Sequence, residues 1–200
     1  METEIVYSNG NMYKGNIGSD GLPNGLGVLS YENGDKYVGN FKNGKKEGIG
    51  VITYRNRNQY IGDFKNDEFS GQGTFYFRTL GDRFEGSYEN GLANGAGKYF
   101  YQNGNRFEGN YSNGRRSGPG VFYFTNGARY VGNFENNNFN GPGKLYYPNG
   151  NILDSNFLNG LPDGLGILFS SFEKKYYEVI YANGLITRYT LIGGNSSNQP

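Results

Sequence analysis

The chain has 200 residues, and its 19 Lys and Arg nearly balance its 18 Asp and Glu, so no long-range field draws it to nucleic acid. It has no Cys and no His, which removes disulfides, thiolate chemistry and the commonest general base and metal ligand. Its mean hydropathy is low (−0.72), yet 19 Tyr and 15 Phe argue against disorder, and 35 Gly indicate that much of the polarity belongs to turns.

The first residues, 1–4, are acidic where a secretory signal would be basic. No apolar run approaches the roughly 20 residues that a membrane-spanning helix needs. We therefore expect a soluble, cytoplasmic protein. Residues 1–12 are expected to form an N-terminal half-hairpin that caps the segments after it.

A phrase of about 23 residues then repeats along the chain. Its second copy has aromatic residues and Gly at alternate positions from Tyr37, an Asn-Gly pair ending at Gly44, then Gly48, Gly50 and a final aromatic, Tyr54. Seven full copies occupy 13–176 and start at Tyr13, Tyr37, Tyr60, Phe84, Phe107, Tyr130 and Leu153. A partial copy over 177–192 is expected to cap the array, and 193–200 to be a disordered tail.

Each copy is predicted to form a β-hairpin. The first strand alternates with a period of two and places Tyr37, Gly39 and Phe41 on one face. The second strand is a short run of β-branched and aromatic residues, and Asn-Gly pairs such as Asn33-Gly34 between copies are strong hairpin signals. The predicted fold is all-β: an elongated single-layer antiparallel β-meander of tandem hairpins, stabilised by stacking between neighbouring copies.

The loop between copies decides which faces of the two strands coincide, because a slip of one residue exchanges them. A two-residue loop puts Tyr37 beside Ser30, and a three-residue loop puts it opposite Tyr31. We favour the three-residue loop because it collects the large side chains of both strands on one face, namely Tyr37, Phe41, Ile52 and Tyr54. Glycines at the third, twelfth and fourteenth positions are expected to leave gaps for rings of neighbouring strands.

The phrase Tyr-x-Gly-x-Phe-x-Asn-Gly, followed by Gly-x-Gly and an aromatic, resembles the MORN repeat over roughly residues 7–184. The terminal copies depart from it at Ile17, Leu153, Ser155 and Val179. Asp67 and Asn137 replace the turn glycine in the third and sixth copies, which suggests turns of a different shape there.

The resemblance implies a non-catalytic scaffold or adaptor in a cytoskeletal or ciliary assembly. Such a scaffold would bind an extended or helical protein segment along an aromatic groove, or a second copy of the chain as a homodimer. The alternative that it implies is a membrane-associating adaptor that binds anionic phospholipid. Basic turn residues are the candidates for that role, although each contributes only about 1 kcal/mol near a membrane: Lys42, Lys45, Lys46, Arg115 and Arg116.

No motif in the chain indicates an enzyme. Gly97-Lys98 and Gly143-Lys144 lack the first Gly and the hydroxyl of a phosphate-binding loop. The recurring acids Asp63, Glu85 and Glu108 are more typical of a solvated strand face than of a carboxylate pair. We therefore expect no catalytic residues, no cofactor and no metal.

Aromatic residues are the strongest candidates for binding. A single-layer sheet cannot bury both of its faces, and a contiguous exposed apolar surface usually marks an interaction site. The candidate groove consists of first-strand aromatics whose ring edges would pack while faces and hydroxyls stay available: Tyr37, Phe41, Tyr60, Phe64, Phe84, Tyr88, Phe107, Tyr111, Tyr130 and Phe134. A secondary aromatic stripe, which we expect to make the C-terminal part more adhesive, comprises Tyr76, Phe100, Tyr123, Tyr146 and Phe169.

Overall fold

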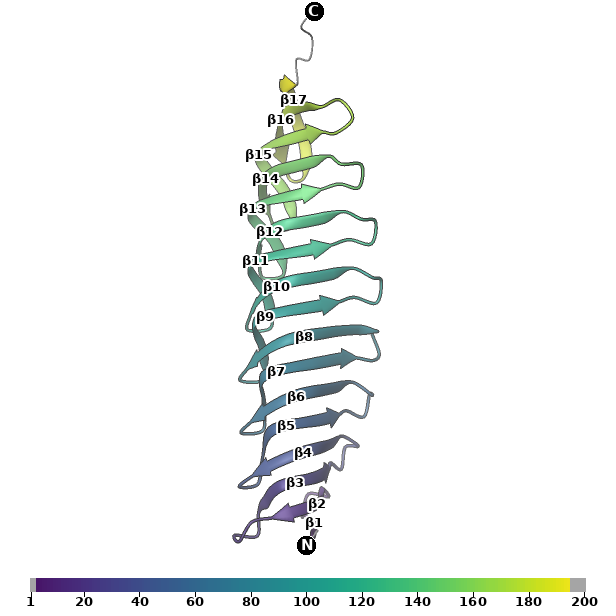
Figure 1. Ribbon diagram of the computed structural model, residues 1–200, viewed down its shortest axis with the longest axis vertical. Helices are drawn as coiled ribbons and strands as arrows, with labels where there is room; N and C mark the ends of the chain where they lie inside the picture. Colours follow the sequence, from purple (N-terminus) through teal and green to yellow (C-terminus); the bar gives the residue numbers. More distant parts are fainter. Residues whose placement is uncertain (1–2, 195–200) are drawn as a thin grey trace, which may run out of the picture. The chain divides into compact units, whose positions relative to one another are not determined.

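The computed structural model describes residues 3–194, and its only regular elements there are β-strands (Figure 1). The described chain divides into two compact units: the N-unit, which ends at Gln102, and the C-unit, which begins at Asn103. The expected tail over 193–200 is wrong at Gly193 and Gly194, which end the last strand, and its remaining residues lie outside the described part.

The N-unit contains nine strands: β1 (Thr3–Val6), β2 (Met12–Ile17), β3 (Pro23–Ser30), β4 (Lys36–Lys42), β5 (Lys45–Thr53), β6 (Gln59–Lys65), β7 (Glu68–Phe77), β8 (Asp82–Glu89) and β9 (Leu92–Phe100). The C-unit contains eight: β10 (Arg106–Ser112), β11 (Arg115–Tyr123), β12 (Arg129–Glu135), β13 (Asn138–Tyr146), β14 (Ile152–Leu158), β15 (Leu161–Ser170), β16 (Lys175–Ala182) and β17 (Leu185–Gly194).

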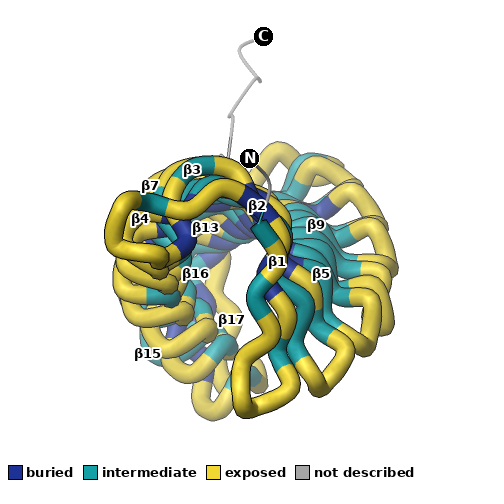
Figure 2. The backbone as a smooth tube through the Cα atoms, turned by 90° about the horizontal axis from the view of Figure 1, so that it is seen from below, coloured by how far each residue is buried: buried dark blue, intermediate teal, exposed yellow. Residues whose placement is uncertain are grey.

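Within each unit every strand pairs antiparallel with the next strand in the chain. This confirms the predicted all-β, single-layer meander of tandem hairpins. The strands bend along their length, so each unit has a concave face (Figure 2). The extra residues of the longer copies lie in turns, at Gly18–Leu22, Arg78–Gly81 and Ser171–Lys174.

Two kinds of turn alternate along the sheet. Inside a copy, Asn43-Gly44 is a two-residue turn in which both residues have positive φ (51° and 79°), the geometry that suits the twist of a tight hairpin. Between copies, Tyr31–Asp35 forms a five-residue loop closed by the Tyr31 N–H donating to the Asp35 carbonyl (2.9 Å). In that loop Gly34 has positive φ, whereas Asn33 does not.

The five-residue loop corrects both predicted registers. Tyr37 lies opposite Leu29, rather than beside Ser30 or opposite Tyr31. The prediction that Tyr37, Phe41, Ile52 and Tyr54 share one face is nevertheless right, because a slip of two residues keeps every side chain on its face. On the other side Tyr37 pairs with Ile52, and the face that carries them is called the ring face from here on.

Glycine under a ring explains how one sheet layer buries an aromatic side chain completely. Tyr37 lies flat over Gly39 and Gly50, which are paired across β4 and β5. A Cβ atom on either glycine would fall 2.4 Å from the Tyr37 hydroxyl oxygen, so no larger residue fits. The fourteenth-position glycine therefore accommodates the ring of the neighbouring strand, as predicted, whereas the third-position glycine accommodates the ring of its own strand.

The twelfth-position glycine has a different role. Gly48 has φ +68° and lies in a bulge where β5 has more residues than β4 opposite Asn40. This left-handed conformation is one that glycine adopts without steric cost. The bulge recurs in the hairpins of the other six full copies.

Asp67 and Asn137 keep the shape of the turn they occupy, so the predicted change of shape is wrong. Both have φ 74°, close to the 79° of Gly44. Their side chains also accept a hydrogen bond from the preceding copy: Lys46 N–H donates to Asp67 Oδ1 and Arg116 N–H donates to Asn137 Oδ1, both at 2.9 Å. The substitutions thus add a clamp between copies.

The seventh copy replaces the ring and a glycine together. Leu153 stands in the ring position and is fully buried, and Ser155 stands where the other full copies have glycine. Since Leu is shorter than Tyr, it leaves space for the Ser155 Cβ. The paired change preserves the packing at this end of the array.

Candidate functional site

The ring face contains all ten residues of the predicted groove, and all ten are buried. Tyr37 has no exposed surface; its ring meets Phe41 edge-on at 5.1 Å and Phe64 of the next copy at 4.9 Å. The same edge-to-face contact with the next copy joins Phe107 to Phe134 at 4.7 Å. These rings therefore form the core of the sheet, and they connect each copy to its neighbour.

The buried tyrosine hydroxyls have partners within their own strands. The hydroxyls of Tyr37, Tyr60 and Tyr130 donate to the carbonyls of residues 40, 63 and 133 at 2.9, 2.9 and 3.0 Å. The expectation that these hydroxyls stay available to a partner is therefore wrong. Burial raises the pKa of Tyr37 and Tyr60, and it raises that of Tyr130 to about 12.

These pKa shifts predict alkaline instability. The unfolded chain releases tyrosine protons near pH 10, whereas folded Tyr130 holds its proton to about 12, so the stability that this group contributes is intact below pH 10 and declines above it. Circular dichroism and tyrosinate absorbance followed together against pH should show ionisation of the buried tyrosines coinciding with loss of the sheet. Tyr130→Phe should lose less stability between pH 10 and 12, and an unchanged alkaline profile in this variant would contradict the assignment.

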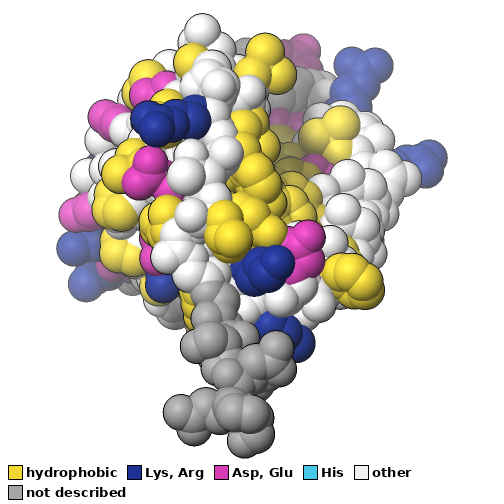
Figure 3. Space-filling model, turned by 90° about the horizontal axis from the view of Figure 1, so that it is seen from above, with side chains coloured by type: hydrophobic (Ala, Val, Ile, Leu, Met, Phe, Trp, Pro, Cys, Tyr) yellow, Lys and Arg dark blue, Asp and Glu magenta, His cyan; other side chains and the backbone are white. Residues whose placement is uncertain are grey.

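A second row of apolar side chains on the ring face remains half-exposed. These residues come from the ends of the second strands and the loops after them: Leu29, Tyr31, Tyr54, Phe75, Phe77, Tyr99 and Tyr101 in the N-unit, and Phe124, Leu145, Tyr147 and Leu168 in the C-unit. Phe75 contacts Phe77 at 4.5 Å, and Tyr99 contacts Tyr101 at 4.5 Å. At the C-terminal end of the molecule, hydrophobic side chains line a hollow (Figure 3). We call this second row of half-exposed apolar side chains the open row.

The open row was not among the predicted site residues, although the repeated final aromatic of each copy pointed to it. Alternation from Tyr37 identified the ring face, but the sequence does not indicate which rings on that face are covered. Coverage depends on the glycine pair beneath each first-strand ring, a contact that brings together two strands.

The tenth position of each copy varies where it lies over the first-strand ring. Phe69 stacks on Tyr60 at 3.8 Å, and Phe139 stacks on Tyr130 at 3.9 Å. Lys46 and Arg116 place a cation there instead, 5.8 Å from the Tyr37 ring centre and 5.5 Å from that of Phe107. The other full copies carry Pro or Ala at this position: Pro23, Ala93 and Pro162.

The model of one repeat family matches seven successive segments of this chain. They are 13–36, 37–59, 60–80, 84–106, 107–129, 130–152 and 154–171, and the family is described as the MORN repeat. The chain belongs to the MORN repeat family. The last matched segment begins at residue 154, beside the unusual Leu153 of the seventh MORN copy.

Two other comparisons give less. No curated protein matches the chain. Among solved structures, the TCP domain of Drosophila melanogaster SAS-4 in complex with a proline-rich motif of Ana2 is 13% identical, with a TM-score of 0.48 and coverage of 86% of this chain and 84% of that one. The wild-type TCP10 domain of Danio rerio CPAP is 15% identical, with a TM-score of 0.30 and coverage of 94% and 99%. At these values neither structure supports an inference about this chain.

The secondary aromatic stripe lies on the face opposite the MORN rings, where arginine side chains stack on it. The guanidinium of Arg83 lies 4.3 Å from the Phe100 ring centre, and Arg106 lies at the same distance from Tyr123. Glu85 and Glu108 flank these arginines, with nitrogen–oxygen distances of 2.8 and 3.2 Å. Further along, Arg129 stacks on Tyr146 and Phe169 contacts Tyr176, while the N-unit carries exposed Leu26, Val38, Ile49 and Ile61 on this face.

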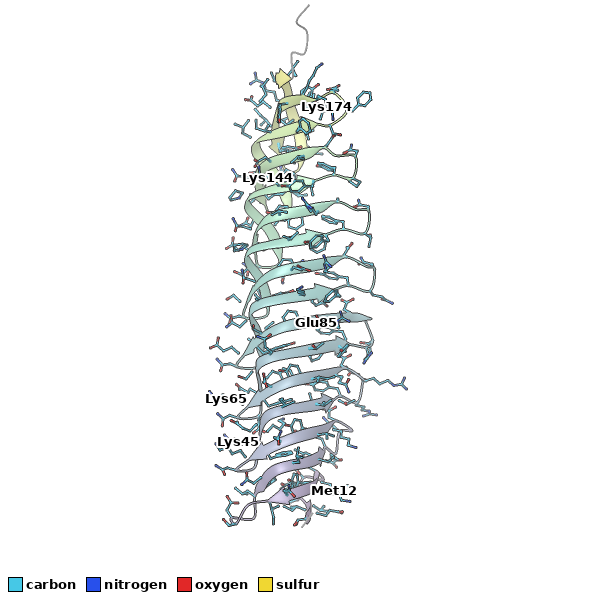
Figure 4. The ribbon with its side chains drawn as sticks, viewed as in Figure 1. Met12, Lys45, Lys65, Glu85, Lys144 and Lys174 are labelled. Carbon is cyan, nitrogen blue, oxygen red and sulfur yellow. The ribbon has the colours of Figure 1, made fainter. Side chains whose placement is uncertain are left out.

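Glu85 and Glu108 offset the charges of Arg83 and Arg106 beside the stripe. Arg83 Nε and Arg106 Nε approach their carboxylates but form no well-aligned hydrogen bond. Both nitrogen–oxygen distances are those of ion pairs, and half-exposed pairs of this kind contribute little to stability. Glu85 and Lys144, which are labelled in Figure 4, alternate with the ring-face residues Phe84 and Leu145 and therefore lie on this face.

The basic residues considered for lipid binding separate into two groups. Lys42, Lys45 and Arg115 are exposed, and Lys45 projects from the edge of its hairpin (Figure 4). Lys46 and Arg116 instead fold onto the ring face. Only the first group lies where a flat anionic surface could reach it.

Residues 3–194 contain neither a membrane-spanning helix nor a metal-binding cluster of acidic side chains. No helix there is long and apolar enough to cross a membrane. No group of three or more acidic side chains lies close enough to hold a metal ion, again within the part of the chain that the structure describes.

Proposed function

We propose that this MORN protein is a non-catalytic scaffold whose ring face binds a segment of a partner protein, within a cytoskeletal or ciliary assembly. The observation that carries the proposal is the open row: half-exposed aromatic and aliphatic side chains that continue from strand to strand within each unit. Exposed apolar surface of this continuity is costly for a soluble chain, and a bound segment would remove it from water.

The site of binding is the open row and not the buried first-strand rings. Phe124 and Tyr147 can offer ring surface to a guest, whereas Tyr130 and Phe107 have no exposed surface. The ten predicted groove residues then support the site from the core of the sheet, because they hold the side chains of the open row in register. Aromatic side chains suit such a role because they bring a large contact area at low entropic cost.

The test selects binding peptides and maps the face that they touch. Random peptides of about 15 residues displayed on phage are selected on the immobilised chain, and a photo-crosslinking amino acid is placed at Phe124 or at Tyr123. These neighbours point to opposite faces of the same hairpin. We expect crosslinks to selected peptides from position 124 and none from position 123.

The pattern of crosslinks separates the competing surfaces. Crosslinks from 123 alone would overturn the proposal and assign binding to the secondary stripe. The lipid alternative has its own arm: vesicles of phosphatidylserine and phosphatidylcholine are sedimented with the chain at two salt concentrations. Salt-sensitive sedimentation with no peptide selected would favour the membrane adaptor, because charge-driven binding weakens as salt rises.

A further inference from the structure

Arg116 has an unusual environment for a charged residue. Its side chain is half-buried on the ring face, and its guanidinium lies 5.5, 5.6 and 5.7 Å from the ring centres of Phe107, Phe122 and Phe134. Its backbone N–H donates to Asn137 Oδ1. Within the described residues, however, no oxygen atom accepts a hydrogen bond from the guanidinium, and no carboxylate lies within 4.0 Å of it. The charge is held over rings without an anion.

Between Phe107 and Ser170, Arg116 is also the one charged residue that points onto the ring face of the C-unit. The positions of the C-unit that point onto the ring face between Phe107 and Ser170 are otherwise aromatic, aliphatic, Gly, Ser, Pro or Asn. A positive charge partly withdrawn from water strengthens any charge-assisted hydrogen bond it makes. The geometry therefore favours a guest that brings one negative charge into an apolar contact.

We propose that a partner segment binds the C-unit with an Asp or Glu carboxylate paired to the Arg116 guanidinium, and apolar side chains on the open row. The inference rests on the proposed function and names the chemistry of its partner. A carboxylate fits better than a phosphate because one guanidinium balances one negative charge, whereas phosphate groups are usually recognised by clusters of arginines. The guanidinium fork also matches a carboxylate in two parallel hydrogen bonds.

Lys46 is the equivalent anchor of the N-unit. It occupies the same tenth position, is half-buried, and lies 5.8 and 6.0 Å from the ring centres of Tyr37 and Phe64. Its Nζ donates to the Tyr31 hydroxyl at 3.1 Å, and among the described residues it forms no ion pair. The carboxylates nearest in the sheet accept from backbone N–H groups instead: Asp67 from Lys46 N–H at 2.9 Å and Asp35 from Arg55 N–H at 2.8 Å.

The experiment compares peptides selected on the wild-type chain with peptides selected on Arg116→Glu, using the same random library. We expect the wild type to enrich peptides with Asp or Glu among apolar residues, and the variant to enrich Lys or Arg in its place. Arg115→Glu is the matched control, because Arg115 is exposed at the start of the same strand, β11, and contacts Asn136 instead of the rings. It should select the same peptides as the wild type.

A second measurement does not depend on the fold of any variant. A selected peptide is synthesised with its Glu replaced by Gln, and both forms are titrated against the wild-type chain. We expect an affinity loss of roughly tenfold or more, the usual range when one partner of a buried charged pair is removed.

The outcomes distinguish this inference from the function beneath it. Peptides that crosslink from position 124 but carry no acid, or bind equally as Gln, overturn the carboxylate anchor and leave the scaffold intact. A failure to select any peptide on the ring face overturns both. Vesicle binding that is lost in Arg116→Glu would show that the Arg116 guanidinium binds lipid and would likewise overturn the proposal.

Discussion

Replacing Gly132 by serine is expected to lower the free energy of unfolding by about 2 to 3 kcal/mol, the upper part of the range for overpacked cores. A Cβ on Gly132 would lie 2.4 Å from the Tyr130 hydroxyl oxygen and 2.7 Å from the Gly143 Cα. Since the hydroxyl donates to the Asn133 carbonyl and the ring is completely buried, the side chain has nowhere to move. Urea unfolding followed by circular dichroism measures the loss.

The seventh copy supplies the compensating change. It has Leu153 with Ser155 where the sixth copy has Tyr130 with Gly132. Tyr130→Leu alone should be destabilising because it removes a buried ring, but combined with Gly132→Ser it should recover part of the loss, giving a favourable coupling energy of about 1 kcal/mol or more. Additive losses in the double variant would show that the ring does not exclude the serine Cβ. Gly193→Ala, with no atom within 4 Å of the new Cβ, is the control.

Phe139→Ala is expected to lower the free energy of unfolding by about 2 to 4 kcal/mol, somewhat below the range for fully buried Phe. Phe139 covers Tyr130 at 3.9 Å and also meets Phe134 at 5.3 Å and Phe157 of the next copy at 6.1 Å. Its removal exposes the Tyr130 ring and breaks a contact that joins two copies. Thermal and urea denaturation of the purified variant measure the change.

Phe172→Ala is the matched control for that prediction. Phe172 belongs to the same unit and is 94% exposed in a turn, so its loss should alter stability by less than about 0.5 kcal/mol. Equal losses in the two variants would mean that Phe139 does not act through its stacking on Tyr130.

Much of the fold could be predicted from alternation and turn residues alone. Tyr37, Gly39 and Phe41 recur at a spacing of two, which specifies strands and one shared face, and the structure has that face. The length of the loop after Ser30 could not be predicted, because Asn33-Gly34 suits a two-residue hairpin as well as a longer loop. The error in register was harmless to the faces since it amounted to two residues.

The site was harder to predict than the fold. Alternation places Tyr37 and Tyr54 on one face but gives no measure of cover, and Tyr37 is buried whereas Tyr54 is half-exposed. That difference arises from Gly39 and Gly50, which meet only after strand pairing. The direction of the Arg116 side chain was equally difficult to predict, because Arg115 and Arg116 together are typical of a charged turn. In the structure both lie on a strand, so Arg115 points outward and Arg116 lies over the rings.

Under the proposed function, the tenth position of each copy determines which partner is bound, whereas the other repeated residues maintain the fold. Glycines and first-strand rings are nearly constant from copy to copy, whereas the residue that lies over the ring changes among Pro, Ala, Lys, Arg and Phe. Duplication of a hairpin can therefore lengthen the array at little structural risk, and a single later substitution can give the new copy its own preference. Sequence divergence between copies is then expected to accumulate at this one residue in each hairpin, while the glycines and the first-strand rings stay the same.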